Sequence, residues 1–137
     1  MNKRPLIEKY FKARATSDLQ AFQEIFTPDV EIYNVHFPVF KGMEGVKAYC
    51  NDFQQRIASC MFTIVDILQE ENKAMVEWTA QLTYRKDATV AGFTLARPFT
   101  VALRGINKFE FNKDKIRCLR IYHETTTVMH LVKEHAQ

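Results

Sequence analysis

The sequence predicts an α+β fold in which a strongly curved antiparallel sheet wraps around helices from the amino-terminal part of the chain. Apolar residues recur at helical spacing in the first third, and much of the second half alternates apolar and polar residues with the period of a strand. Two short polar turns divide that half into hairpins. Helices on one face of an antiparallel sheet define the α+β class. The length of 137 residues suits one domain, residues 1–137.

The first helix is indicated by an apolar stripe that ends near Thr16. Its members lie three and four residues apart, which places them on one helix face. They are Leu6, Ile7, Tyr10 and Phe11.

A second helix should begin within residues 17–20, which have the pattern of a capping box. In that motif the Ser17 hydroxyl accepts a hydrogen bond from the Gln20 amide, while the Gln20 side chain reaches back. Pro28 should end this helix, because proline does not continue a helical hydrogen-bond ladder.

The remaining elements are expected in the order strand, helix, four strands and a short closing helix. Polar turns of hairpin length separate the four strands at residues 70–73 and 112–115. The expected strands cover residues 30–34, 61–68, 74–84, 100–111 and 116–124, and the expected helices cover residues 46–57 and 128–132. Residues 87–96 are too apolar for a free loop, so they should cap a hollow or pack against a second subunit.

Two asparagines occupy strand positions at which the pattern calls for an apolar side chain. Asn34 shares a face with Val30 and Ile32, and Asn107 shares a face with Phe109. Burying an unpaired amide costs roughly 1–3 kcal/mol, unless the amide is paired or faces a cavity that holds a ligand. We interpret the two residues as marking a pocket. The alternative is that each is a structural amide bonded to backbone at a bulge.

Composition argues against several classes of function. The net charge is only +3, and basic residues are scattered among acidic ones, so no nucleic-acid partner is expected. No apolar run reaches membrane-spanning length and no signal peptide is apparent, so we expect no membrane association and a cytoplasmic location. Three widely spaced cysteines indicate buried thiols in a reducing compartment. Because no histidine pair has helical ligand spacing, no metal site is expected.

Several short motifs carry a resemblance to a known superfamily. They are Tyr10 and residues 18–22, 26–30, 40–42, 106–111, 115–116 and 122–124. In this order they resemble the nuclear-transport-factor-2-like superfamily, which includes ketosteroid isomerases, scytalone dehydratase and SnoaL-type polyketide cyclases. The resemblance covers about residues 6–131. It implies a cone-shaped roll with an apolar pocket at its wide end and frequent dimerisation through the sheet.

The resemblance also assigns roles to residues of the pocket. In ketosteroid isomerases a Tyr and a protonated Asp hold the developing oxyanion, and a second Asp moves the proton. Tyr10 corresponds to that Tyr, Asn107 to the oxyanion Asp and Asn34 to the base. An amide cannot accept a proton near pH 7, and losing a positioned base typically removes about 10²–10⁴ in rate. The acid/base Asp of SnoaL-type cyclases corresponds to Ile121.

Other residues are candidates for the proton carrier. His36 continues the phase of the first strand if that strand extends so far, whereas Phe37 and Pro38 favour an exposed loop. His123 and Glu124 end the last strand on opposite faces, so one of the two should face the interior. Glu124 corresponds to an acidic position that is common in the superfamily.

The sequence leaves three functions open, and none of them requires a cofactor. The first is binding of a hydrophobic, oxygen-bearing small molecule. The second is an isomerase, dehydratase or cyclase acting beside a carbonyl, with His36 or Glu124 as the proton carrier. The third is a protein-interaction module docking through an outer sheet face marked by Ile106 and Leu119, which a homodimer would cover equally well. The residues assigned to the pocket are Tyr10, Asn34 and Asn107 for polar contacts and Trp78, Phe109 and Ile121 for the apolar wall.

Overall fold

The computed structural model describes residues 2–35 and 37–137 and has the predicted α+β architecture. Helices come first and a long run of strands follows. The elements are α1 Arg4–Thr16, α2 Leu19–Ile25, β1 Phe26–Asn34, β2 Phe40–Lys41, α3 Gly42–Arg56, β3 Ile57–Gln69, β4 Lys73–Tyr84, β5 Thr89–Val90, β6 Phe93–Thr94, β7 Phe99–Asn112, β8 Lys115–His123 and α4 Thr126–His135. Within the described residues, no helix is long and apolar enough to cross a membrane.

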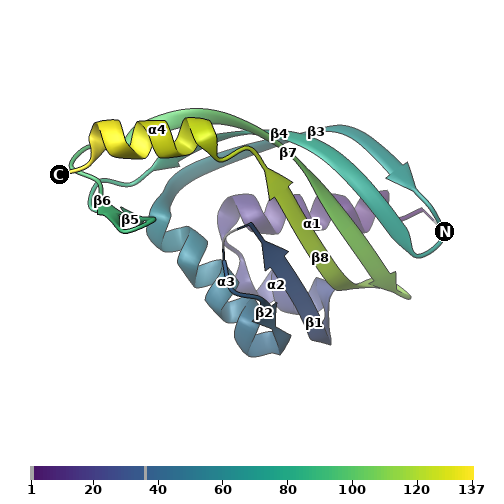
Figure 1. The fold of residues 1–137 in the computed structure, drawn as a ribbon. Coiled ribbons are helices and arrows are strands. Elements are labelled where there is room, and N and C mark those ends of the chain that lie inside the picture. Colours follow the sequence, from purple (N-terminus) through teal and green to yellow (C-terminus); the bar gives the residue numbers. More distant parts are fainter. Residues whose placement is uncertain (1, 36) are drawn as a thin grey trace.

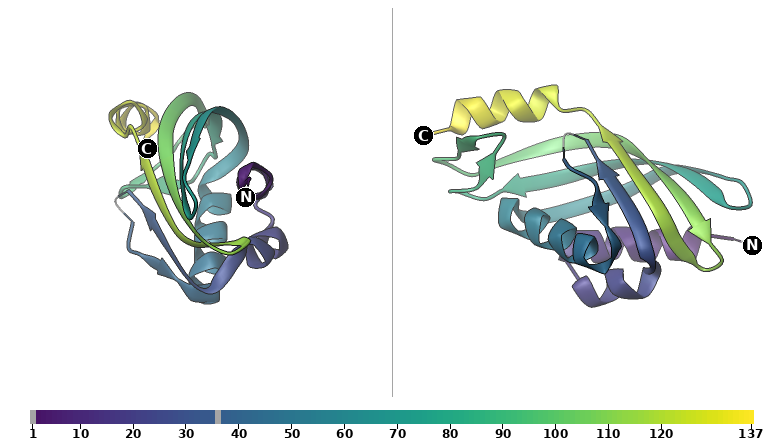
Figure 2. Two further views of the ribbon diagram at one scale, coloured as in Figure 1. Left: turned by 90° about the vertical axis from the view of Figure 1, so that its right-hand side faces the viewer. Right: turned by 60° about the horizontal axis from the view of Figure 1, so that its bottom comes forward.

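The main sheet has the strand order β2-β1-β8-β7-β4-β3 and arches over α1, α2 and α3 (Figure 1). Seen end-on in Figure 2, it curls around α1 and α3. The expected hairpins β3–β4 and β7–β8 are present, and β4 also pairs with β7 in antiparallel fashion. One pair differs from the predicted antiparallel sheet, because β1 and β8 are parallel. The long connection between these two strands permits this, since parallel neighbours need a crossover rather than a tight turn.

The core lies between the concave face of the sheet and the helices. Burial alternates along β4, where every second residue from Ala74 to Tyr84 is buried, as the period-two pattern predicted. Leu119 differs from its expected place on the outer face. It is fully buried, and its pairing partners Ile32 and Phe109 are fully buried as well. Because paired residues on neighbouring strands share a face, Leu119 belongs to the core.

The start of α2 and its end both differ from the prediction. The cap is Asp18, whose side chain accepts a hydrogen bond from the amide of Ala21 at 3.1 Å. Ser17 instead closes α1 in a left-handed conformation, with φ of 51°, and therefore cannot also begin the next helix. Pro28 lies inside β1, which starts at Phe26, so the helix ends before the proline rather than at it.

The apolar segment at residues 87–96 forms the small β5–β6 hairpin beside the main sheet. Ala88 and Leu95 are buried at its base. The amide of Ala96 donates to the carbonyl of His135 at 2.7 Å, which ties the hairpin to the end of α4. Val90 and Ala91 of this segment line the hollow beneath the sheet, which agrees with the capping role, and packing against a second subunit stays a prediction.

Cys50, Cys60 and Cys118 are free thiols. Cys50 and Cys118 are buried and Cys60 is half-buried. Burial raises the pKa of Cys60 to about 12, and it also raises the pKa of the other two thiols. Since the thiolate is the nucleophile and the metal ligand, burial disfavours the reactive form of all three.

Candidate functional site

A cavity of about 330 Å³ lies beneath the sheet, among side chains of α1, α3 and the strands. Tyr10, Asn34, Trp78, Asn107 and Ile121 all line it. Asn34 and Asn107 both pair with Ile121 of β8, so the sheet register places them two strands apart, a separation of about 10 Å. The alternating pattern of the sequence therefore brings both amides to the wall of one space.

Four polar side chains form a hydrogen-bonded chain across the wall of the cavity. The hydroxyl oxygens of Tyr10 in α1 and Tyr49 in α3 are 2.6 Å apart. The Trp78 indole N–H donates to Asn107 Oδ1 at 2.9 Å. A hydrogen bond with Asn107 lowers the pKa of Tyr10, as expected when the Asn107 amide nitrogen donates to the Tyr10 oxygen. Asn107 thus connects the helix layer to the sheet.

Tyr10 and Tyr49 are both neutral at neutral pH. Burial raises the pKa of Tyr10 well above its ordinary value, and burial also raises the pKa of Tyr49. The bond between the two hydroxyls raises the pKa of Tyr10 and lowers that of Tyr49. Either hydroxyl can donate in this bond, so one hydroxyl hydrogen of the pair is left to donate into the cavity that both tyrosines line.

Asn34 stands in a different situation from Asn107. It is buried at the end of β1, and its Oδ1 is enclosed without a hydrogen-bond partner among the residues that the structure describes. Neither asparagine uses its side chain to bond backbone at a bulge, since Asn107 bonds Trp78 instead. Asn34 lines the cavity, and its Oδ1 is an unsatisfied acceptor enclosed within the cavity wall.

Of the three residues assigned to the apolar wall, Ile121 and Phe109 occupy different depths. Ile121 lines the cavity, whereas Phe109 lies behind it and is fully buried. The Phe109 ring packs edge-on against Tyr10 with 5.3 Å between centroids. Phe109 thus supports the ring of Tyr10 from behind.

The two candidate proton carriers at the end of the last strand are separated by the fold. His36 lies outside the described residues. His123 lines the cavity, with its ring centroid 6.4 Å from that of Trp78. Glu124 is exposed, and a hydrogen bond from Thr127 lowers its pKa. Of the last-strand pair, His123 is therefore the residue that faces inward.

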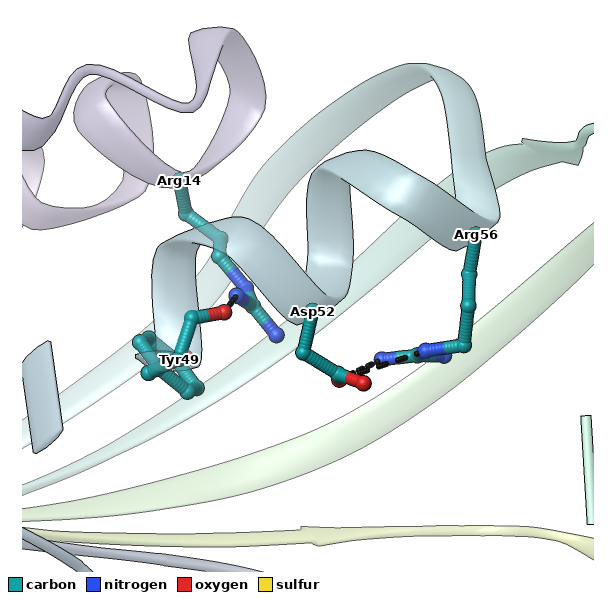
Figure 3. A network of polar contacts seen from close by, with 4 residues as sticks. All are labelled: Arg14, Tyr49, Asp52 and Arg56. Atoms are coloured by element: carbon teal, nitrogen blue, oxygen red, sulfur yellow. Dashed lines mark hydrogen bonds and ion pairs between the residues drawn. The ribbon is translucent and has the colours of Figure 1, made fainter. Parts of the chain in front are cut away.

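Sequence reasoning missed the arginines of the site. Arg14 is buried at the end of α1, and its guanidinium carbon lies 3.9 Å from the ring centroid of Tyr49 and 3.7 Å from that of Phe53. Figure 3 shows it reaching α3, where Nη1 donates to the Tyr49 carbonyl at 3.5 Å. Arg56 also lines the cavity and pairs with Asp52 at 2.9 Å. The sequence signal for Arg14 was its helical spacing from the apolar residues of the first helix.

Arg14 continues the apolar stripe of the first helix. It lies four residues after Tyr10 and seven after Ile7, which is the spacing of one helix face. A charged residue on an otherwise apolar face is as informative as an asparagine on an apolar strand face. The sequence pattern alone does not distinguish a guanidinium that folds back to solvent from one that enters a cavity.

Gly105 is a second residue that sequence reasoning missed. It pairs with Trp78 and with His123, both of which line the cavity. A Cβ at Gly105 would lie 2.5 Å from Cζ2 of Trp78 and 2.4 Å from the carbonyl oxygen of Tyr122. Only glycine allows the indole to lie across β7 here. A glycine inside a strand pattern was the signal.

In the part of the chain that the structure describes, no group of three or more His, Cys, Asp or Glu residues is placed to hold a metal ion. The arrangement offers hydrogen-bond donors and acceptors in an apolar enclosure. That combination can orient an oxygen-bearing molecule and polarise a carbonyl group.

Comparison with known proteins agrees with this geometry. A family model described as the SnoaL-like domain matches residues 7–119, which is most of the chain. The chain belongs to the SnoaL-like domain family. A search of curated proteins finds no match.

Solved structures show the same fold as this SnoaL-like chain. A SnoaL-like protein of Shewanella denitrificans has a TM-score of 0.83 at 13% identity, with 96% of this chain and 97% of that one covered. A protein of Catenulispora acidiphila with a ketosteroid isomerase-like fold gives 0.74 at 14% identity, covering 95% and 93%. An LEH-like epoxide hydrolase of Mycobacterium tuberculosis gives 0.70 at 16%, covering 97% and 90%. At these identities the likeness is one of fold, and one fold hosts many reactions.

Proposed function

We propose that this SnoaL-like protein binds a hydrophobic, oxygen-bearing small molecule in the cavity. The observation that carries the proposal is the enclosed Oδ1 of Asn34, which has no partner among the described residues. Leaving a buried acceptor unpaired costs about 1–3 kcal/mol. Rotation of the Asn34 amide toward the cavity would let a ligand hydroxyl satisfy it, while the hydroxyl hydrogen left over from the Tyr10–Tyr49 bond donates to a second ligand oxygen.

The enclosure suits a compact, largely apolar ligand. Its volume of about 330 Å³ lies near the small end of the range of about 300–1,000 Å³ that is typical of ligand pockets. Trp78, Leu103 and Ile121 supply apolar wall from three strands. Few polar groups on a mostly apolar wall are the pattern of sites that recognise small molecules by orientation.

Thermal unfolding with hydrophobic phenols and ketones tests the proposal. A ligand at about 100 times its Kd stabilises the folded state by about 2.7 kcal/mol, so the melting temperature should rise in a saturable way. Ile121→Trp fills the cavity and should abolish the shift. Tyr122→Ala, which changes the neighbouring exposed residue, should leave the shift intact. No shift at high concentration of any such compound would contradict the proposal.

The position of His123 favours a second candidate function, general acid–base chemistry beside a carbonyl. An imidazole ordinarily titrates near neutral pH, and this one lines the cavity. Tyr10, Tyr49 and Asn107 would polarise the carbonyl oxygen. The activity would be that of an isomerase, a dehydratase or a cyclase.

Deuterium exchange into hydrophobic ketones measures such chemistry directly. His123→Ala should reduce the enzyme-dependent exchange by about 10²–10⁴ if His123 moves the proton. His36→Ala and Glu124→Gln, measured alongside, assign the role among the three candidates. Equal exchange rates in wild type and all three variants would remove the claim for each of them.

We further propose that the outer face of the sheet forms a homodimer. Ile106 of β7 and Tyr122 of β8 pair on this face and are 42% and 52% exposed, and Met75 of β4 is 42% exposed. Large apolar side chains gathered on a sheet face favour a covered surface. Size measurement by light scattering should give a dimer, and Ile106→Glu should give a monomer, whereas Val39→Glu should not. A monomeric wild type would contradict the proposal.

A further inference from the structure

We propose that the ligand carries a carboxylate and that Arg14 binds it where α1 meets α3. This inference rests on the proposed function, since it requires the cavity to be a ligand site. It adds the chemical class of the molecule, an apolar organic acid. None of the sequence motifs that indicate the pocket gives Arg14 a ligand-binding role.

The cavity carries a positive charge that the protein does not balance. Arg14 is 6% exposed and remains protonated at all ordinary pH values. Within the described residues no Asp or Glu forms an ion pair with it, and none lines the cavity. The other lining arginine, Arg56, is already paired with Asp52 (Figure 3). Buried charges are ordinarily paired, so Arg14 is the exception that calls for a partner.

The contacts of Arg14 hold its guanidinium in place without using its donors. Tyr49 and Phe53 pack against the group through their rings. Its single hydrogen bond, from Nη1 to the Tyr49 carbonyl, is 3.5 Å long, against a usual range of about 2.7–3.2 Å. Four of the five N–H groups of an arginine therefore remain available within the described structure, if that weak bond is counted.

The available donors reach the cavity rather than being sealed in the core. Thr27 Oγ1 and Asn34 Oδ1 are the side-chain polar atoms that are both enclosed and unpartnered among the described residues. Nε and Nη2 of Arg14 differ from these two atoms: they make no hydrogen bond to a described residue, yet they are not enclosed. Since Arg14 is buried from the outside and lines the cavity, these two nitrogens open onto it. Together they form the edge that binds a carboxylate in bidentate fashion.

A purely structural role does not account for this placement. Arg14 lies in the last turn of α1, where a cation interacts favourably with the helix dipole, typically by about 0.3–1 kcal/mol. An exposed lysine or arginine would provide the same interaction. Burying a cation costs several kcal/mol after relaxation, which is more than the helix end returns. The charge of Arg14 also reaches the phenols, since it lowers the pKa of Tyr10 and of Tyr49 against the larger effect of burial.

The experiment compares naphthalene carboxylate with naphthalene carboxamide by calorimetry at neutral pH. The two probes have the same ring and similar size and differ in charge. Wild type should bind the carboxylate about 10- to 100-fold more tightly, which is the range expected for a hydrogen-bonded charge. Arg14→Gln should remove this preference, because it weakens carboxylate binding far more than carboxamide binding, and Arg14→Lys should retain part of it. Arg104→Gln, on the outer face, is the matched control and should keep the full preference.

The outcomes distinguish failure of the carboxylate assignment from failure of the proposed ligand-binding function. Equal affinity of wild type for both probes, or binding of the carboxamide alone, would overturn the carboxylate assignment and leave the proposed function standing. A preference that survives in Arg14→Gln would overturn the role of Arg14. Binding of neither probe would count against both proposals. If Arg14→Gln does not fold, the comparison within wild type and the Arg14→Lys variant still give the answer.

Discussion

At the scale of single residues, Asn34 and Asn107 occupy similar strand positions but contribute differently to the fold. Asn107 accepts from the Trp78 indole and donates to Tyr10, so it joins the sheet to α1. Asn34 has no hydrogen-bond partner for its Oδ1 among the described residues. One amide therefore stabilises the protein, whereas the other holds the unsatisfied acceptor that we propose a ligand pairs with.

This difference predicts opposite effects of the same substitution. Asn107→Leu should lower the free energy of unfolding by about 1–3 kcal/mol, because it leaves the buried indole N–H without a partner. Asn34→Leu should leave that free energy unchanged or raise it, while weakening the binding of phenols. Urea unfolding of both variants measures the effect. Equal losses in the two variants would contradict the assignment.

The buried phenols predict a dependence on alkaline pH. Burial raises the pKa of Tyr10, Tyr49 and Tyr84, so the folded state holds these protons more tightly than the unfolded state. Their stabilising contribution is complete below the unfolded pKa of about 10 and is lost as pH rises through the folded values. Ultraviolet titration should show a group of tyrosines that ionise only as the protein unfolds. Tyr10→Phe should make that group smaller, and an unchanged late group would contradict the prediction.

The residue-scale features were partly readable from the sequence. A polar residue on an alternating apolar strand identified Asn34 and Asn107, because register fixes which face each side chain takes. Arg14 and Tyr49 were not identified, since both lie on helices whose long side chains reach over neighbouring turns. Which of them enters a cavity depends on how α1 and α3 pack.

At the scale of elements, the strand β7 is shaped around one side chain of β4. Gly105 leaves the space in which the Trp78 indole lies, and this position brings the indole N–H to Asn107. Gly105→Ala would place a Cβ 2.5 Å from the ring and 2.4 Å from the Tyr122 carbonyl oxygen, so strand or ring must move. A change at this one position should therefore be transmitted to the cavity wall.

We predict that Gly105→Ala lowers stability by about 1–3 kcal/mol, as overpacking of a core typically does. It should also alter the fluorescence of Trp78, the only tryptophan of the chain. Gly92→Ala is the control. That glycine has a φ of +84° but nothing within 4 Å of an added Cβ, so it should lose stability through backbone strain and keep the tryptophan spectrum. An unchanged spectrum in Gly105→Ala would contradict this account of β7.

Element boundaries show where sequence reasoning reaches its limit. Ser17 and Asp18 are both good capping residues, and the choice between them depends on how the chain leaves α1. The left-handed conformation of Ser17 settles it in favour of Asp18. The hairpin at residues 87–96 carries neither a helical nor a strand period over enough length, so only its apolar content was informative.

At the scale of the whole molecule, the curved sheet over the helices was predictable because each strand buries one face only. The alternation along β4 and β7 fixes the concave side, and the polar turns at residues 70–73 and 112–115 fix the hairpins. The parallel pairing of β1 with β8 was not predictable in this way. It joins segments about 80 residues apart along the chain, a relation that no local pattern carries.

Nuclear magnetic resonance of the Trp78 indole N–H tests the central claim, that the cavity beneath the sheet is a ligand site. The chain contains one tryptophan, so its indole signal needs no assignment, and Trp78 lines the cavity. Titration with naphthol, a neutral hydrophobic phenol, should shift the indole and Asn107 side-chain signals in a saturable way. Signals that stay fixed at high naphthol concentration, or shifts confined to Ile106 and Tyr122 on the outer face, would contradict the claim.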